Sequence, residues 1–128
     1  LTHFVATTGT TGTLMGVSRA LKERDPRVQI VAVQPSEGSQ IPGIRRWPEA
    51  YRPKLYQPER LDALRDVTQQ QAVEATRELA RTEGVFAGMT SGAAAWIARE
   101  LCRELREGVV AFVLCDRGDR YLSSTLFG

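Results

Sequence analysis

The feature that most constrains the fold is a turn rich in glycine and threonine at residues 7–13, near the start of the chain. An apolar run at residues 4–6 precedes it, and a pattern typical of an amphipathic helix begins at Leu14. The first N–H groups of a helix have no partner within the helix, and the helix dipole adds partial positive charge there. Gly9 and Gly12 let the backbone approach a ligand closely. A strand, such a turn and a helix N-terminus therefore predict an anion site, which we interpret as a cradle for a phosphate.

Apolar runs and helical patterns alternate along the chain. Residues 3–6, 28–33 and 109–114 are nearly continuous apolar runs, typical of strands that are buried on both faces, and residues 64–67 form a shorter candidate strand. Helical patterns are expected at residues 12–24 and 68–84, and from about residue 90 to Gly108. Thr68 with Gln71 three residues later predicts a capping box at the start of the second pattern. This alternation predicts an α/β domain over residues 1–128, a three-layer αβα fold with a parallel sheet. We expect residues 109–114 to form its central strand.

Composition narrows the function classes. The chain has 128 residues, of which 42% are apolar and 25% charged, as in a globular domain with its own core. A net charge of +2 does not favour nucleic acid as a partner, and no apolar run is long enough to cross a membrane. His3 is the single histidine, and Cys102 and Cys115 are the only cysteines, so we expect no metal site and a reducing, cytoplasmic compartment.

Two further segments are expected to meet the threonine turn. Parallel strands end at the same sheet edge, so the segment that starts at Cys115-Asp116 should lie beside it. Thr90 and Ser91 open the last helical pattern. They are either caps of that helix or hydroxyls that face a ligand.

The stretch from residue 34 to 60 has five prolines and no regular period. Within it, Arg45 and Arg46 stand between Gly43 and Trp47. Two adjacent arginines could receive an anionic substrate, or they could belong to a solvated loop with one packed tryptophan. Composition leaves both interpretations open.

Common phosphate motifs do not match the threonine turn. A P-loop requires lysine after its last glycine, but Thr13 follows Gly12. The glycines at 9, 12 and 16 do not have the spacing of a dinucleotide fingerprint. A single histidine with no partnered serine or cysteine makes hydrolase chemistry a poor fit. A small phosphorylated cofactor remains as the ligand.

These residues resemble a known family. Residues 9–13, Gly-Thr-Thr-Gly-Thr, resemble the phosphate cup of the fold-type II pyridoxal-phosphate enzymes, and residues 88–93, Gly-Met-Thr-Ser-Gly-Ala, resemble their second motif. Residues 41–47 and 115–121 are similar to the corresponding segments of the B-type cysteine synthases (O-acetylserine sulfhydrylases), which accept thiosulfate as well as sulfide. The motifs occur in matching order over the whole chain.

The resemblance implies roles for individual residues. The phosphate of pyridoxal 5'-phosphate would be held by Gly9, Thr10, Thr11, Gly12 and Thr13. Thr90 would face the pyridine nitrogen, where the family usually has serine; a hydroxyl there leaves the nitrogen unprotonated and favours β-replacement over transamination. The residues implied at the substrate mouth and in admitting the sulfur donor are Gly43, Ile44, Arg45, Arg46, Cys115 and Asp116.

The resemblance also implies an activity, that of a transferase which replaces the acetate of O-acetylserine with sulfur from sulfide or thiosulfate. The family works as a homodimer and attaches its cofactor to a lysine in a Ser-x-Lys-x-Arg segment. Neither Lys22 nor Lys54 fits that segment. We therefore expect the chain to be the C-terminal part of a longer enzyme, inactive without an N-terminal half that carries the lysine.

Two alternatives remain open. The first is another fold-type II enzyme, of the cystathionine β-synthase type or one that uses O-phosphoserine or threonine. The second is a non-catalytic module in which the threonine turn binds a phosphorylated effector.

Overall fold

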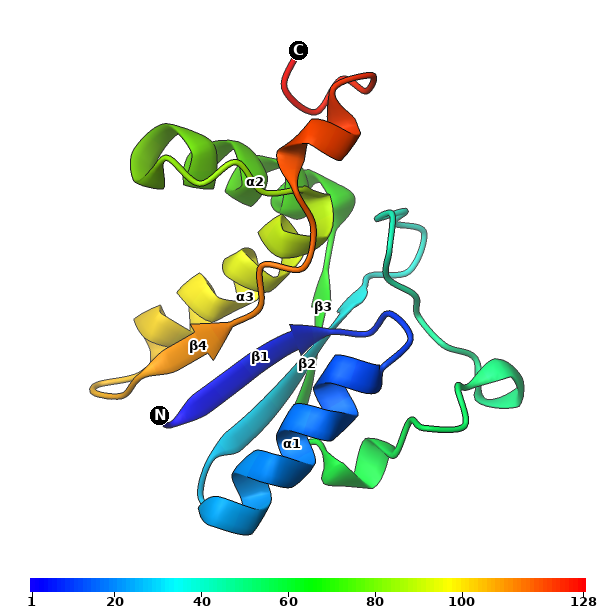
Figure 1. The fold of residues 1–128 in the computed structure, drawn as a ribbon, viewed down its shortest axis with the longest axis vertical. Coiled ribbons are helices and arrows are strands. Elements are labelled where there is room, and N and C mark those ends of the chain that lie inside the picture. The colour runs from blue at the N-terminus through cyan, green and yellow to red at the C-terminus, as the bar shows by residue number, and fades with distance from the viewer.

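The computed structural model describes residues 1–128, and its strands form one parallel sheet (Figure 1). The sheet order is β3-β2-β1-β4. The strands are β1 (His3–Thr7), β2 (Gln29–Pro35), β3 (Ala63–Val67) and β4 (Val110–Phe112), and the helices are α1 (Gly12–Arg24), α2 (Gln69–Glu83) and α3 (Met89–Glu104). The predicted α/β class with a parallel sheet is confirmed. None of the helices has the length and apolar character needed to cross a membrane.

The two faces of the sheet build two separate apolar clusters. Side chains alternate along a strand, so neighbouring residues of β1 and β2 point to opposite faces. One face packs on α1 and contributes Phe4, Ala6, Ile30 and Ala32 together with Leu14 and Met15 of the helix. The other face packs on α3, with α2 against it, and contributes Val5, Val31 and Val33 together with Ala72, Ala93, Ile97 and Leu101. Burial on both faces explains why these strands are continuous apolar runs.

The expectation that residues 109–114 form the central strand is wrong. Only Val110–Phe112 pair in the sheet, and their sole neighbour is β1, so β4 is an edge strand. Val109 is 60% exposed and Leu114 is 48% exposed. An apolar run is a sign of burial only where the fold supplies a neighbour on each side, and within this chain β2 already occupies the other side of β1.

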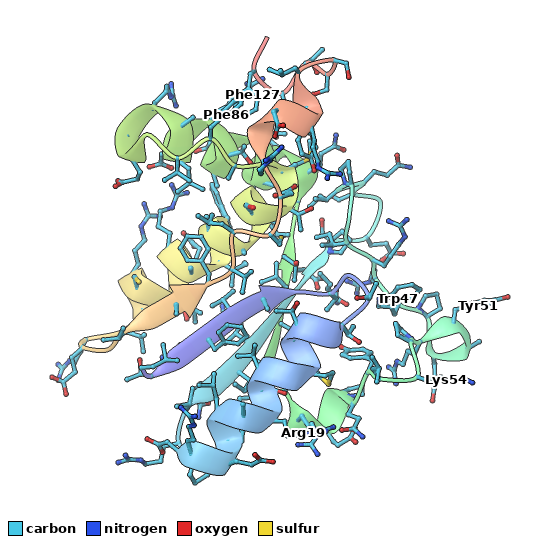
Figure 2. The ribbon with its side chains drawn as sticks, viewed as in Figure 1. Arg19, Trp47, Tyr51, Lys54, Phe86 and Phe127 are labelled. Carbon is cyan, nitrogen blue, oxygen red and sulfur yellow. The ribbon has the colours of Figure 1, made fainter.

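The helix ends follow local sequence signals in part. Thr68 and Gln71 form the predicted capping box at the start of α2, and Gly84 ends this helix in the left-handed conformation (φ 66°). α3 ends at Glu104, before the predicted stop at Gly108. The segment after β4 returns to the connection between α2 and α3, where the rings of Phe86 and Phe127 lie 4.8 Å apart (Figure 2).

The close contact between α2 and α3 depends on Gly92. A Cβ atom there would overlap the Thr76 hydroxyl and the Ala72 carbonyl, whereas one at Gly16 of α1 would meet open space. We expect Gly92→Ala to lower the free energy of unfolding by about 2–3 kcal/mol through overpacking. Gly16→Ala, the matched control, should raise it by about 0.5–1 kcal/mol because alanine suits a helix interior better. Urea unfolding of both variants checks this, and equal effects would contradict the assigned contact.

Candidate functional site

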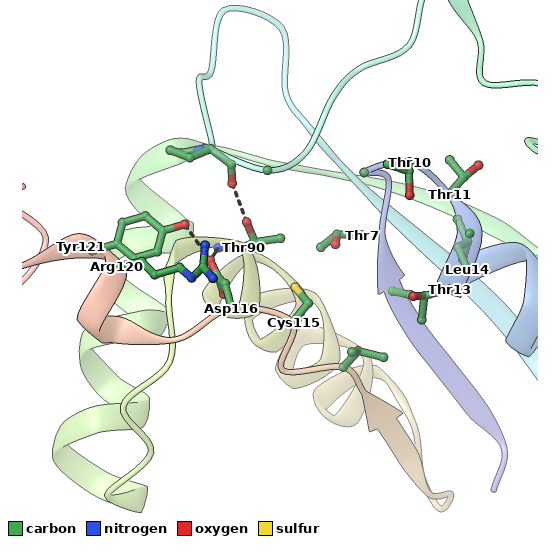
Figure 3. Close-up of a pocket in the computed structure, with 16 residues that line it drawn as sticks. Thr7, Thr10, Thr11, Thr13, Leu14, Thr90, Cys115, Asp116, Arg120 and Tyr121 are labelled. Carbon is green, nitrogen blue, oxygen red and sulfur yellow. Dashed lines mark hydrogen bonds between the residues drawn. The ribbon is translucent and has the colours of Figure 1, made fainter.

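A pocket of about 410 Å³ lies at the edge of the sheet where β1 and β4 end (Figure 3). Four segments that are far apart in the sequence line it: the threonine turn, the loop after β2, the start of α3 and the segment after β4. Of the residues predicted for the site, it collects Gly9, Thr10, Thr11, Gly12, Thr13, Gly43, Thr90, Cys115 and Asp116. The expected meeting of the strand ends is confirmed.

The threonine turn carries unsatisfied donors. None of the backbone N–H groups of residues 9–14 donates a hydrogen bond to another group of the chain. Thr11 precedes α1 in a left-handed conformation (φ 68°), and its buried hydroxyl has no hydrogen-bond partner. A left-handed threonine stores strain, and strain of this kind occurs mostly at ligand sites. Free amides and a free hydroxyl at a helix N-terminus make an anion site.

The segment at residues 41–47 docks onto this turn through three bonds that the sequence did not reveal. The Thr8 hydroxyl donates to the Arg45 carbonyl at 2.6 Å, and the Arg45 N–H donates back to the Thr8 carbonyl at 2.9 Å. The Trp47 indole N–H donates to the Gly9 carbonyl at 2.8 Å. Thr8 and Trp47 therefore position the turn. Residue type alone could have suggested Trp47, because a buried indole N–H needs an acceptor.

Gly43 brings the same segment against Thr90. Its φ of 91° lies in a region that favours glycine, and a Cβ atom there would come within 2.8 Å of the Thr90 hydroxyl oxygen. The Thr90 hydroxyl donates to the carbonyl of Pro42 at 2.5 Å. The backbone of Pro42 and Gly43 and the side chain of Thr90 are thus in direct contact in the wall of the pocket.

Asp116 holds the N-terminus of α3 (Figure 3). Its carboxylate accepts from the N–H groups of Thr90 (3.1 Å) and Ser91 (2.9 Å) and from the Ser91 hydroxyl (2.5 Å). The Tyr121 hydroxyl donates to it at 2.6 Å. The interpretation of Thr90 and Ser91 as side-chain caps is wrong, since Gly88 is the N-cap residue and the capping acceptor comes from Asp116, across the fold.

The contacts of Asp116, Tyr121 and Cys115 also explain the pKa shifts of these three side chains. Burial raises the pKa of Asp116, but the hydrogen bonds from Ser91, Tyr121 and the backbone outweigh it, and the net pKa lies below its usual value. Burial and the bond to Asp116 raise the pKa of Tyr121 to about 12. Burial of the Cys115 thiol and the nearby charge of Asp116 raise the pKa of that cysteine. Tyr121 and Cys115 are therefore neutral near pH 7.

Three predicted substrate residues lie outside this pocket. Ile44 is buried in the core, and the Arg46 guanidinium pairs with Asp66 at 2.8 Å. Arg45 and Arg46 line a second hollow of about 560 Å³ instead. The pocket gains Arg120, which no sequence signal singled out beyond its place after an apolar strand.

The two lysines lie away from the pocket. The ammonium group of Lys22 pairs with Asp62 at 2.7 Å, and Lys54 is exposed on the irregular segment (Figure 2). Neither lines the pocket. Covalent chemistry at a lysine amine is therefore not available to a ligand held here by residues 1–128.

The fold and the pocket together define an α/β domain with a candidate anion site between a strand and a helix N-terminus. The family model described as "Pyridoxal-phosphate dependent enzyme" matches residues 1–116. The chain belongs to this family of pyridoxal-phosphate-dependent enzymes.

Sequence similarity to individual proteins supports this family assignment. The chain is 55% identical over 127 residues to "Cysteine synthase B" of Pseudomonas aeruginosa, covering 99% of this chain and 42% of that protein. It is 48% identical to "Cysteine synthase B" of Escherichia coli, covering 100% of this chain and 42% of that protein. The chain therefore spans about two fifths of the length of these relatives.

Solved structures are similar over nearly the whole chain. The crystal structure of O-ureido-L-serine synthase matches with a TM-score of 0.89 at 36% identity, over 99% of this chain and 43% of that one. O-acetylserine sulfhydrylase isoform 3 from Entamoeba histolytica matches with a TM-score of 0.86 at 30% identity, over 99% of this chain and 41% of that one. The fold is that of the cysteine synthase group of fold-type II enzymes.

The residues present fit pyridoxal phosphate. Its phosphate needs several donors, and the free amides of residues 9–14 and the Thr11 hydroxyl supply them. A pocket of about 410 Å³ lies within the size range of small-molecule and cofactor sites. Thr90 brings a hydroxyl to the same pocket.

The hydrogen bonds of Asp116 to the start of α3 predict how its replacement changes stability. Asp116→Asn should lower the free energy of unfolding at pH 7 by about 2 kcal/mol, because α3 loses its charged cap. The folded-state pKa of Asp116 is depressed, so its contribution is present above the unfolded pKa, near 4, and is lost as the pH falls through the folded pKa. The difference between wild type and variant should therefore shrink below about pH 4.

Denaturant unfolding between acidic and neutral pH measures that difference. Asp119→Asn is the control, because Asp119 only pairs with exposed Arg117 in the same segment and should change stability by less than about 0.5 kcal/mol. A difference for Asp116→Asn that stays constant with pH would show that charge is not the cause.

Proposed function

We propose that this chain is the cofactor-holding part of a cysteine synthase. The complete protein, on this proposal, is a transferase that replaces the acetate of O-acetylserine with sulfur. The observation that carries the proposal is the set of free amides and the buried Thr11 hydroxyl at the start of α1. The 48–55% identity to proteins named cysteine synthase B supports the choice of reaction.

Each part of the pocket would have one task. Gly9, Thr10, Thr11, Gly12 and Thr13 would bind the phosphate with backbone and hydroxyl donors. Thr90 would meet the pyridine nitrogen at the other side of the pocket. When bound, pyridoxal phosphate supplies an electron sink that lets an amino-acid substrate lose a group from its β-carbon.

The remaining residues would shape the entrance. Gly43 would leave room for the substrate beside Thr90, and buried Ile44 would hold the backbone of that segment in place. Cys115 and Asp116 would line the floor, where the thiol is neutral near pH 7 and the carboxylate is engaged by α3.

The reactive lysine would lie outside residues 1–128, in an N-terminal half of the same enzyme. The positions of Lys22 and Lys54, both away from the pocket, support this. We further propose that the complete enzyme is a cytoplasmic homodimer, as the family resemblance implies.

The test is an assay of the complete protein with pyridoxal phosphate, O-acetylserine and sulfide, with cysteine as the measured product. We expect turnover by the complete protein and none by residues 1–128 alone. After borohydride reduction, mass spectrometry should find no cofactor on Lys22 or Lys54. Turnover by the isolated segment, or a complete protein that binds the cofactor without making cysteine, would contradict the proposal.

Thiosulfate is the proposed second sulfur donor, and Arg45 and Arg46 are the proposed anion receivers. Arg46 is held by Asp66 whereas the Arg45 side chain makes no ion pair, so Arg45 should contribute more. The double replacement by alanine should lower kcat/KM for thiosulfate about tenfold, the cost of one lost charged hydrogen bond, and leave sulfide use nearly unchanged. Arg19→Ala on α1 is the control, and equal losses for both donors would remove the role.

A related reaction is the second candidate. The similarity to an O-acetylserine-dependent cystathionine β-synthase from Helicobacter pylori (TM-score 0.83) favours O-acetylserine as the first substrate. The similarity to O-ureido-L-serine synthase (TM-score 0.89) leaves a product other than cysteine open. Products formed from O-acetylserine, O-phosphoserine and threonine separate these enzymes. An effector-binding module would form no product from any of them.

A further inference from the structure

We infer that Trp47 is a positioning residue for the cofactor phosphate. Its indole N–H holds the peptide group between Gly9 and Thr10 in the orientation that directs the Thr10 N–H into the pocket. The backbone N–H of Arg45 acts in the same way on the preceding peptide group, between Thr8 and Gly9. The inference rests on the proposed function, in which residues 9–13 bind that phosphate.

The carbonyl and the N–H of one peptide group point in opposite directions. This follows because the peptide group is planar and, throughout this chain, trans. A hydrogen bond that fixes the carbonyl on one side of the chain therefore also fixes the direction of the N–H on the other side.

Two consecutive carbonyls of the threonine turn are held in this way. The Trp47 indole N–H donates to the Gly9 carbonyl at 2.8 Å, and the Arg45 N–H donates to the Thr8 carbonyl at 2.9 Å. The two segments lie in close contact, since a Cβ atom at Gly9 would come within 3.0 Å of the Gly43 carbonyl oxygen. The peptide groups on both sides of Gly9 are thus fixed by one neighbouring segment.

Both donors act on the turn from outside the pocket. Trp47 and Arg45 do not line the pocket, whereas Gly9 and Thr10 do. The N–H groups of Gly9 and Thr10 point away from these outer donors and hence toward the pocket. Neither N–H donates to another group of the chain, so both are available to an anion.

The bond from Trp47 matters because Gly9 has no side chain to limit its backbone. Glycine reaches conformations that are closed to other residues, so without an external bond its peptide groups would sample several orientations. A turn in that state would have to be ordered before it bound a phosphate, and this cost would lower the affinity.

A purely structural role for Trp47 predicts a different result. An indole N–H that is removed from water needs an acceptor whatever the pocket binds. Loss of such a bond would lower stability and weaken the binding of every form of the cofactor alike. A role in directing the amides of residues 9 and 10 affects the phosphate alone. A comparison of cofactor with and without its phosphate therefore separates the two roles.

The experiment titrates the complete protein, after removal of its cofactor, with pyridoxal phosphate and with pyridoxal, which lacks the phosphate. The measured quantity is the ratio of the two dissociation constants. Trp47→Phe keeps an aromatic ring and removes the N–H. It should weaken the binding of pyridoxal phosphate about tenfold, the effect of one lost hydrogen bond to a charged group, and leave the binding of pyridoxal nearly unchanged.

The control is Trp96→Phe, the same replacement on α3. Trp96 packs under the Arg99 guanidinium, 4.4 Å from the ring centroid, and does not line the pocket. This variant should leave the ratio unchanged. If Trp47→Phe does not fold, benzothienylalanine at position 47 decides, because it keeps the shape of tryptophan and has sulfur in place of the N–H.

Three results would overturn the inference. The first is an unchanged ratio after replacement of Trp47, and the second is an equal weakening of both ligands. The third is a change of the ratio in Trp96→Phe as large as that in Trp47→Phe.

Failure of this inference can be distinguished from failure of the proposed function. The titration needs only binding, so it remains readable in a protein that makes no cysteine. A protein that makes cysteine with an unchanged ratio in Trp47→Phe would retain the proposed function and lose the inference. A wild-type protein that binds pyridoxal as tightly as pyridoxal phosphate would overturn both.

Discussion

The arrangement of the pocket depends on the Asp116 carboxylate at the N-terminus of α3. It accepts from two backbone N–H groups and a hydroxyl of that helix, and from Tyr121 in the segment that follows it. These bonds join the segment after β4 to the helix that carries Thr90. Because a charged acceptor at a helix N-terminus satisfies both the free amides and the dipole, the same interaction stabilises the fold and places a pocket wall.

The wall of the pocket at the start of α1 differs, because its donors have no acceptor within the chain. At the start of α1 the amides of residues 9–14 and the Thr11 hydroxyl have no partner in the chain. Two helices thus present their N-termini to one pocket, one with a protein carboxylate as its acceptor and one open to a ligand. The bonds from Thr8, Arg45 and Trp47 hold the open turn in shape, which lowers the ordering cost of binding a phosphate.

The sequence predicted many of the residues that line the pocket, but not the contacts that hold those residues in place. Residues 9–13, Gly43, Thr90, Cys115 and Asp116 all line it as predicted. Ile44, Arg45 and Arg46 do not, because the segment that contains them turns at Gly43 and directs their side chains to the core and to a second hollow. Tyr121 and Arg120 lie in the family-like segment 115–121, but no role was predicted for either, because the sequence does not show which way their side chains point.

By itself the sequence determined the α/β class, the two strands buried on both faces, the capping box of α2 and the turn of glycine and threonine at the start of α1. Each of these arises from groups within a few residues of one another or from a repeating pattern. Only the tertiary structure decided that β4 is an edge strand, that Asp116 caps α3, and that Arg120 lines the pocket. Those features depend on which segments become neighbours in space. Residues that become neighbours only in the folded chain need not be linked by any pattern in the sequence.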